Sequence, residues 1–149
     1  MSARKYLPTL SDLVDRLSIT LMKSIFIPDH AEEYRAEMDL IIHDIDVAIG
    51  EIKEHNAGFE LGAAAIHAIQ AIMLTNRAIW EGESKARAGG DQQDQLLKLT
   101  HSLNGQRNAA KNVLSALAGE RRDWKVDAFA ASLVKEYGNW QIFNPANDP

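Results

Sequence analysis

The chain has 149 residues, of which 46% are hydrophobic and 25% charged, and it contains no cysteine. This apolar content is ordinary for one globular domain and too high for an intrinsically disordered chain. The lack of cysteine excludes disulfides, thiolate catalysis and cysteine-ligated metal centres. The formal net charge of −5 disfavours a general nucleic-acid-binding protein, which would usually carry a basic excess.

The chain shows no targeting or membrane signal. Residues 1–8 are polar and lack the apolar core of a signal peptide. No stretch reaches the ~18 apolar residues of a transmembrane helix, and the densest, 61–74, is interrupted by His67 and Gln70. We therefore expect a cytoplasmic protein that does not bind membranes.

The charges are unevenly distributed along the chain. Residues 1–94 hold 9 basic and 16 acidic side chains, a net charge of −7, whereas residues 95–149 hold 7 and 5, a net charge of +2. Solvated helix faces explain the acidic excess most simply. The basic end could instead present a modest site for anions.

Helical periodicity dominates from the start, and no convincing strand pattern competes with it. Ser11 or Thr9 is the expected N-cap of a first helix that runs to about Phe26. Pro28 should break this helix, because proline disfavours helical geometry at the residue before it. Asp29 is then expected to cap the next helix.

The second helix is expected from about residue 30 to residue 54. If it pairs with the first helix across Pro28, Arg16 should come near Asp44 and form a structural ion pair. The apolar residues of the second helix recur at steps of three and four. They predict a buried stripe of Tyr34, Met38, Ile41, Ile45, Ala48 and Ile52.

The same helix carries one triplet that could bind a metal ion. Asp39, His43 and Asp46 share one face, and oxygen and imidazole ligands at this spacing can converge on an ion. Polar helix faces produce such triplets often, and no other helix supplies a matching set. A solvated face explains the triplet more simply, so we assign no metal site.

A third helix is expected over about 60–88 and a fourth over about 91–118. The third is apolar nearly all round between residues 63 and 74, which predicts the central and most buried helix. Gly89 and Gly90 should end it, and Asp91 should cap the fourth. The fourth helix has a stripe, interrupted by Arg107, that consists of Leu96, Leu99, Leu103, Ala110, Leu114 and Leu117.

Beyond Gly119, a shorter fifth helix is expected from Asp123, with an apolar face of Val126, Phe129, Ala130 and Leu133. The tail over 138–149 carries Trp140, Ile142 and Phe143 and should dock on the bundle. We therefore predict a single all-α domain over residues 1–149, with an N-terminal arm at 1–8. Its fold should be an antiparallel four-helix bundle of long helices, with a shorter C-terminal helix and a docked tail.

The polar chemistry is concentrated on the third and fourth helices. Helical spacing puts Asn76, Trp80, Glu83 and Arg87 on one stripe, and His101, Asn104, Asn108 and Lys111 on another. Antiparallel pairing about Gly89 and Gly90 would place Trp80 opposite His101, and Asn76 opposite Asn104 and Asn108. These groups either satisfy one another and fix the register of the helices, or form a ligand pocket. In a pocket, the amides with Arg107 or Lys111 would hold a polar or anionic ligand, and Trp80 would form an apolar wall.

One enzyme template remains as an alternative. The MazG-type nucleotide pyrophosphohydrolases use clustered acids on adjacent helices to hold magnesium against a triphosphate. Glu32, Glu33 and Glu37 would form the first cluster, and Asp12 and Asp15 have the spacing of a second one, although on an earlier helix. Magnesium is expected only under this alternative. The chain lacks the glycine-rich phosphate loops, the nucleophile elbow and the Glu-x-x-His pairs of di-iron bundles.

Three segments, residues 12–19, 76–87 and 104–112, resemble a group of small all-α proteins of tailed bacteriophages, particularly marine ones. They are also similar to a bacterial helical family of unknown function whose genes lie near those of glycosyltransferases. The shared elements are Asp-Arg-Leu, Trp-x-x-Glu and Asn-x-x-Arg-Asn. The resemblance implies a helical bundle and a polar layer of Asn76, Trp80, His101, Asn104, Arg107 and Asn108. It implies no activity, so we assign no catalytic residue.

These observations predict a non-catalytic, oligomeric binding protein, which the resemblance suggests is encoded by a phage. Its ligand would be a nucleotide or sugar phosphate in the polar layer, or a host protein partner. A partner would bind an apolar surface near Trp124, Trp140 and Phe143. A purely structural or oligomerisation role is the remaining alternative to binding and to the MazG-like activity.

Overall fold

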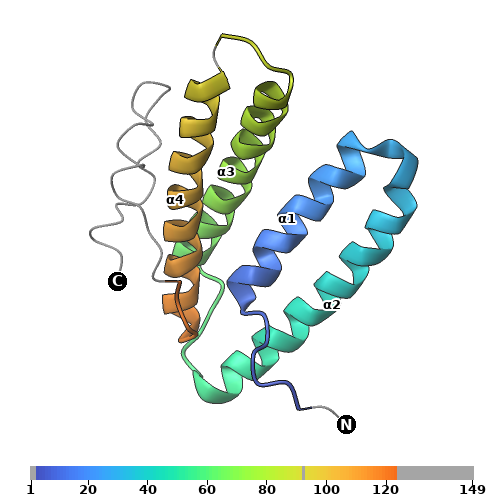
Figure 1. The fold of residues 1–149 in the computed structure, drawn as a ribbon. Helices are drawn as coiled ribbons and strands as arrows, with labels where there is room; N and C mark the ends of the chain where they lie inside the picture. Colours follow the sequence, from blue (N-terminus) through green and yellow to red (C-terminus); the bar gives the residue numbers. More distant parts are fainter. Residues whose placement is uncertain (1–2, 92, 124–149) are drawn as a thin grey trace.

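The computed structural model describes residues 3–91 and 93–123, and every regular element within them is a helix. They are α1 (Leu10–Phe26), the short 3-10 helix η1 (Pro28–His30), α2 (Ala31–His55), α3 (Ala63–Arg87) and α4 (Gln93–Ala118). Figure 1 shows α1 and α2 as one pair, beside a second pair formed by α3 and α4. The prediction of an all-α fold is therefore confirmed for the described residues, and the packing of the helices is consistent with a bundle.

The helix α1 begins where its capping residues can satisfy its first amides. The Asp12 N–H donates to Thr9 Oγ1 (3.2 Å), and the Thr9 N–H donates to Asp12 Oδ2 (3.0 Å), which is a capping box. Thr9 is therefore the N-cap, and Ser11 lies inside the helix. Asp29 does not cap α2, because Pro28 begins a 3-10 turn that leads directly into α2 through His30.

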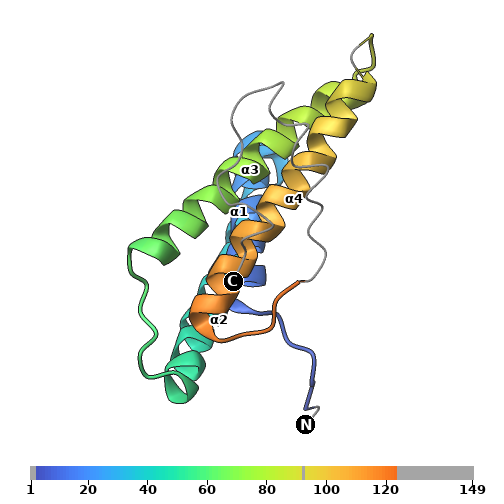
Figure 2. The ribbon, with the colours of Figure 1, turned by 90° about the vertical axis from the view of Figure 1, so that its left-hand side faces the viewer.

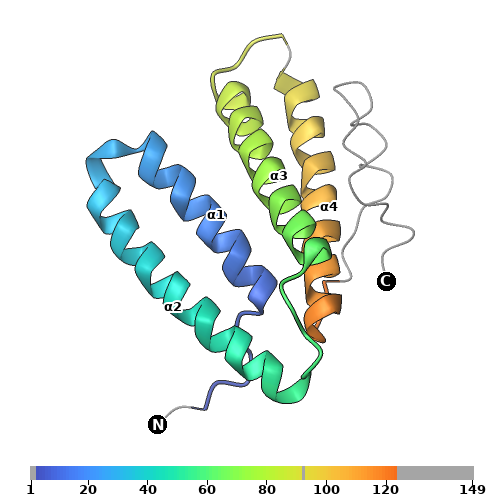
Figure 3. The same ribbon diagram turned by 180° about the vertical axis from the view of Figure 1, so that it is seen from behind.

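The helix α1 lies at the centre of the arrangement. It packs against α2, α3 and α4, whereas α2 packs mainly against α1. Figure 3 shows α2 at the outer edge, with α1 between it and the α3–α4 pair, and Figure 2 shows α1 behind that pair. Only Ile41 and Ile52 of the predicted α2 stripe are fully buried, as expected for a helix at the edge.

The prediction that the third helix is the most buried one is wrong. Ile66 and Leu74 of α3 are 50% and 52% exposed, so only one side of this helix faces the core. By contrast, α4 buries side chains around most of its circumference, including Leu103, Gln106 and Leu114. An apolar run of alanine and isoleucine is compatible with partial exposure, because alanine adds little hydrophobic area.

The main apolar core lies where α1, α2, α3 and α4 come together near the start of α1. Its buried members are Leu10, Ile52, Phe59, Ala65, Ala68, Leu114 and Ala118. Further along, α3 and α4 approach closely at Gly82, where a Cβ atom would lie 2.9 Å from Thr100 Oγ1. A larger side chain at residue 82 would force the two helices apart, so this glycine sets their separation.

The ion pair predicted between the first two helices has a different acidic partner. Arg16 Nε lies 3.5 Å from Glu37 Oε1, whereas Asp44 lies beside its neighbour His43. The tight turn at Pro28 brings Glu37 level with Arg16, and Asp44 lies about two helical turns further on. This exposed ion pair is consistent with the register of α1 against α2 but contributes little to stability.

The fifth helix predicted from Asp123 and the tail predicted over 138–149 lie outside the described residues, as do Trp124, Trp140 and Phe143. None of the described helices combines the length and the apolar content that a membrane span requires.

Candidate functional site

Three of the predicted polar residues lie where α3 and α4 face α1. Arg107 Nη1 donates to Asn76 Oδ1 over 3.1 Å, so α3 and α4 meet close to the predicted register. One turn further along α4, Lys111 is 18% exposed, and its Nζ lies 3.0 Å from Asp12 Oδ1 and 3.7 Å from Asp15 Oδ2. Asn76, Arg107 and Lys111 therefore belong to one polar layer.

The other predicted site residues lie elsewhere. Trp80 packs against Phe26 at the end of α1, with ring centroids 5.9 Å apart. Glu83 and Arg87 form an ion pair of 3.7 Å and line a separate cavity of about 260 Å³ near the end of α3. His101 is exposed, and Asn104 and Asn108 are half-buried.

The residues that sequence reasoning missed come from α1. Asn76 is only 2% exposed, and its Nδ2 donates to Asp15 Oδ1 (2.7 Å) and Ser18 Oγ (3.2 Å). The amide of Asn76 thus joins α1, α3 and α4 in one network. The available signal is the spacing of Asp12 and Asp15, which the MazG-like alternative interprets as part of a magnesium cluster.

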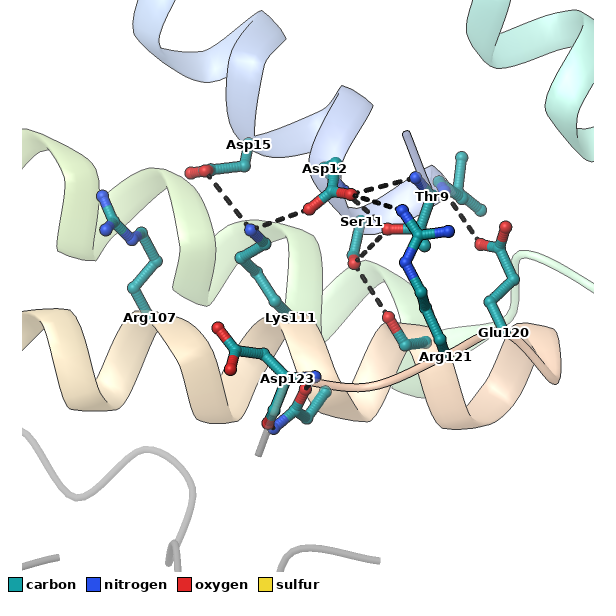
Figure 4. A network of polar contacts seen from close by, with 12 residues as sticks. Thr9, Ser11, Asp12, Asp15, Arg107, Lys111, Glu120, Arg121 and Asp123 are labelled. Carbon is teal, nitrogen blue, oxygen red and sulfur yellow. Dashed lines mark hydrogen bonds and ion pairs between the residues drawn. The ribbon is translucent and has the colours of Figure 1, made fainter. Parts of the chain in front are cut away.

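A polar cavity of about 510 Å³ lies beside this network, between the start of α1 and the end of α4 (Figure 4). Cationic, acidic and hydroxyl side chains line it together. They are Tyr6, Thr9, Ser11, Asp12, Lys111, Asn112, Ser115, Arg121, Arg122 and Asp123.

Hydroxyl groups connect the two helices on the floor of the cavity. Ser11 Oγ lies 2.8 Å from Ser115 Oγ on α4 and 3.1 Å from Thr9 Oγ1. All three side chains are buried. Because a hydroxyl can both donate and accept, these three hydroxyl groups can reverse the direction of the hydrogen bonds between them when a ligand offers a new acceptor.

The segment after α4 turns back to close the cavity. Gly119 has a φ of 71°, a left-handed conformation that glycine adopts readily, and it ends the helix. Asn112 Nδ2 then donates to the Asp123 carbonyl oxygen (2.6 Å), and the Asp123 N–H donates to Asn112 Oδ1 (2.9 Å). This pair of bonds holds residues 120–123 alongside α4.

Contacts of Glu120 and Arg121 tie this segment to the N-terminal arm and to the start of α1. The Leu10 N–H donates to Glu120 Oε1 over 2.8 Å. Arg121 Nη2 donates to the Leu7 carbonyl oxygen and lies 3.7 Å from Asp12 Oδ2, and its guanidinium sits 4.0 Å from the Tyr6 ring centroid. We call these contacts of Glu120 and Arg121 the terminal clasp.

Asp12, which lines the cavity, and Glu120 of the neighbouring segment have opposite pKa shifts. Partial burial acts to raise the pKa of Asp12, but the Thr9 N–H and the Lys111 ammonium outweigh it and hold this pKa below its usual range. Burial raises the pKa of Glu120, against the Leu10 N–H bond and with further contributions from Asp12 and Glu51. Asp12 therefore remains charged at neutral pH and balances the lysine.

The α2 residues considered for metal binding do not converge within the described part of the chain, and Asp12 and Asp15 pair with Lys111 instead. Asp39, His43 and Asp46 are all exposed, and His43 Nδ1 lies 3.2 Å from Asp44 Oδ1. Glu32 and Glu33 are exposed, and Glu37 pairs with Arg16. Among the described residues, no group of three or more histidine or acidic side chains is placed to hold a metal ion.

We find no match to this chain among protein-family models, curated proteins or solved structures. The resemblance to phage proteins therefore stays a prediction.

Proposed function

We propose that this protein is a non-catalytic binding protein that holds a small anionic ligand, such as a nucleotide or sugar phosphate, in the polar cavity. The observation that carries the proposal is the convergence of Lys111, Arg121 and Arg122 with buried hydroxyls on one cavity of about 510 Å³. This volume lies within the range of small-molecule sites, about 300–1,000 Å³.

The cations of the cavity are suited to a phosphate group. Lys111 is held at the cavity by Asp12 and offers a compact charge. Arg121 is 41% exposed, and its 3.7 Å pair with Asp12 is of the weak, solvent-screened kind. A phosphate could therefore replace that carboxylate and accept two parallel hydrogen bonds from the guanidinium.

The remaining groups suit the uncharged part of such a ligand. Ser11 and Ser115 offer hydroxyl donors, and Asp123 brings a carboxylate to the lining of the cavity. Carboxylates accept hydrogen bonds from sugar hydroxyls, so a ligand with both a phosphate and a sugar would use both signs of charge. A fully anionic polymer would be repelled by the acidic side chains, which favours a small ligand.

The same proposal includes the finer features that the sequence predicts. The chain would be a cytoplasmic, oligomeric protein, and its fold an antiparallel four-helix bundle completed by a C-terminal helix and tail beyond residue 123. In a phage, such a protein would sequester a metabolite or signal of the host.

Calorimetric titration of the full chain tests the proposal directly. The probes are inorganic phosphate, AMP, ATP and glucose 6-phosphate, with adenosine and glucose as uncharged counterparts. We expect a phosphorylated probe to bind and its uncharged counterpart to fail. Lys111→Met and Arg121→Gln should each weaken binding by about 10-fold or more, which corresponds to the loss of one charged hydrogen bond.

Lys98→Met is the matched control, because Lys98 is an exposed lysine of the same helix that does not line the cavity. It should leave binding unchanged. Circular dichroism at the titration temperature shows that each variant is folded. The proposal is wrong if every phosphorylated probe fails to bind, or if binding survives unchanged in both Lys111→Met and Arg121→Gln.

A further inference from the structure

Among its described lining residues, the polar cavity has one aromatic side chain, that of Tyr6 in the N-terminal arm. The Arg121 guanidinium lies over this ring, 4.0 Å from its centroid, and therefore covers one of its two faces. Tyr6 is nevertheless 81% exposed, so the opposite face of the ring is open. An open aromatic face beside a cavity can stack against a flat group of a ligand.

The terminal clasp holds this ring in place. Arg121 Nη2 donates to the carbonyl oxygen of Leu7, the residue after Tyr6, and the same guanidinium lies over the ring. A cation over an aromatic face is attracted by the electrons of that face. Because these contacts restrain the ring before a ligand arrives, stacking on it costs less conformational entropy than stacking on a mobile side chain.

The ring and the cations of the cavity are close neighbours. Arg121 contacts the Tyr6 ring and also lies 3.7 Å from Asp12 Oδ2. Asp12 Oδ1 is in turn 3.0 Å from Lys111 Nζ, and Figure 4 shows both cations beside this carboxylate. A small ligand with its phosphate at Lys111 and Arg121 therefore has an aromatic surface within reach of its other end.

This combination of groups distinguishes between the two ligand classes considered above. A nucleotide carries a phosphate and a flat aromatic base on one sugar, whereas a sugar phosphate has no flat ring. We propose that the ligand of the polar cavity is a nucleoside monophosphate, with its base stacked on Tyr6 and its phosphate bound by Lys111 and Arg121. This inference rests on the proposed function and names the ligand class within it.

The charge of the lining favours one phosphate group over three. The charged members of the lining are three cations and two carboxylates, which gives a formal net charge of +1. They are Lys111, Arg121, Arg122, Asp12 and Asp123. A phosphate monoester carries a charge of about −1.5 to −2 at pH 7, which this lining largely balances. A triphosphate would bring further negative charge against the two carboxylates, so AMP should bind at least as tightly as ATP.

Calorimetric titration of the full chain with AMP and with ribose 5-phosphate tests the role of the base, because these probes share their sugar and phosphate. AMP should bind about 10-fold more tightly, which is the typical contribution of a base stacked on an aromatic side chain. Tyr6→Ala should remove this difference by weakening the binding of AMP but not of ribose 5-phosphate. Tyr6→Phe keeps the ring and should bind AMP like the wild type. Tyr34→Ala is the matched control, because Tyr34 is a tyrosine of α2 that does not line the cavity.

Photochemical labelling gives an independent test of where the base lies. The probe 8-azido-AMP carries its reactive group on the base, so illumination should attach it beside the stacking surface. Trypsin cleaves after Lys5 and Arg16 and releases residues 6–16 as one peptide. Mass spectrometry should find the label in this peptide, at Tyr6 or Leu7, and an excess of AMP should abolish the labelling.

This inference and the proposed function can fail separately. If ribose 5-phosphate binds as tightly as AMP, or if Tyr6→Ala leaves AMP binding unchanged or weakens both probes equally, the base does not stack on Tyr6. The inference is then wrong although a phosphate site remains. Tighter binding of ATP than of AMP, or a label found only outside residues 6–7, also overturns it. If none of the phosphorylated probes binds, the proposed function and this inference are both wrong.

Discussion

The replacement of Asn76 by alanine tests whether the polar layer holds the helices together. Asn76 is 2% exposed and bonds to Asp15 and Arg107, both charged, and to Ser18. A hydrogen bond to a charged group contributes about 1.5–3 kcal/mol, and bonds within one network are not additive. We therefore expect Asn76→Ala to lower the free energy of unfolding by about 3 kcal/mol, which corresponds to a fall of about 10 °C in Tm.

Urea unfolding followed by circular dichroism measures this loss. Asn104→Ala is the control, since Asn104 is a half-buried asparagine on the facing helix, and its replacement should cost less than about 0.5 kcal/mol. Equal losses for Asn76→Ala and Asn104→Ala would refute the reasoning.

Two further predictions concern single positions. Glu120→Gln should match or exceed the wild-type stability at neutral pH, because the amide oxygen can still accept the Leu10 N–H bond without burial of a charge. Burial raises the folded-state pKa of Glu120, so the wild type should lose stability relative to this variant as the pH rises above about 4.5. The measurement is the free energy of unfolding in urea at several pH values. If the difference between wild type and variant is the same at every pH, the prediction is wrong. Gly82→Ala should cost about 1–2 kcal/mol, because its Cβ would lie 2.9 Å from Thr100 Oγ1. In a Thr100→Ala background the same change should instead stabilise by up to about 1 kcal/mol, and a double-mutant cycle that shows no such reversal would refute the contact.

The helix boundaries were largely accessible from the sequence, because they depend on local chemistry. Thr9 caps α1, Pro28 ends the first helical run and Gly119 follows α4, and each acts within about one helical turn. The capping role of Asp29 was mispredicted because a 3-10 turn and a fresh helix start look alike in sequence.

The site was only partly accessible, because it depends on which way each helix faces. The approach of Asn76 to the middle of α4 follows from the short connection between α3 and α4. The pairing of Asp12 and Asp15 with Lys111 could not be predicted from the sequence. In sequence these two residues look like ordinary surface acids near the start of a helix. Trp80 turns to Phe26 at the other end of α1, a long-range preference that periodicity cannot reveal.

The terminal clasp has a consequence for the order of folding. Its bond between Leu10 and Glu120 and the neighbouring bond between Ser11 and Ser115 join residues 110 and 104 positions apart, whereas each helix pair is connected by a short turn. Loop-closure entropy therefore favours early formation of the α1–α2 and α3–α4 pairs, and their docking comes last. Weakening a contact that forms after the transition state speeds unfolding and leaves the folding rate nearly unchanged. A clasp that closes after the transition state would therefore lengthen the lifetime of the native state without slowing its formation.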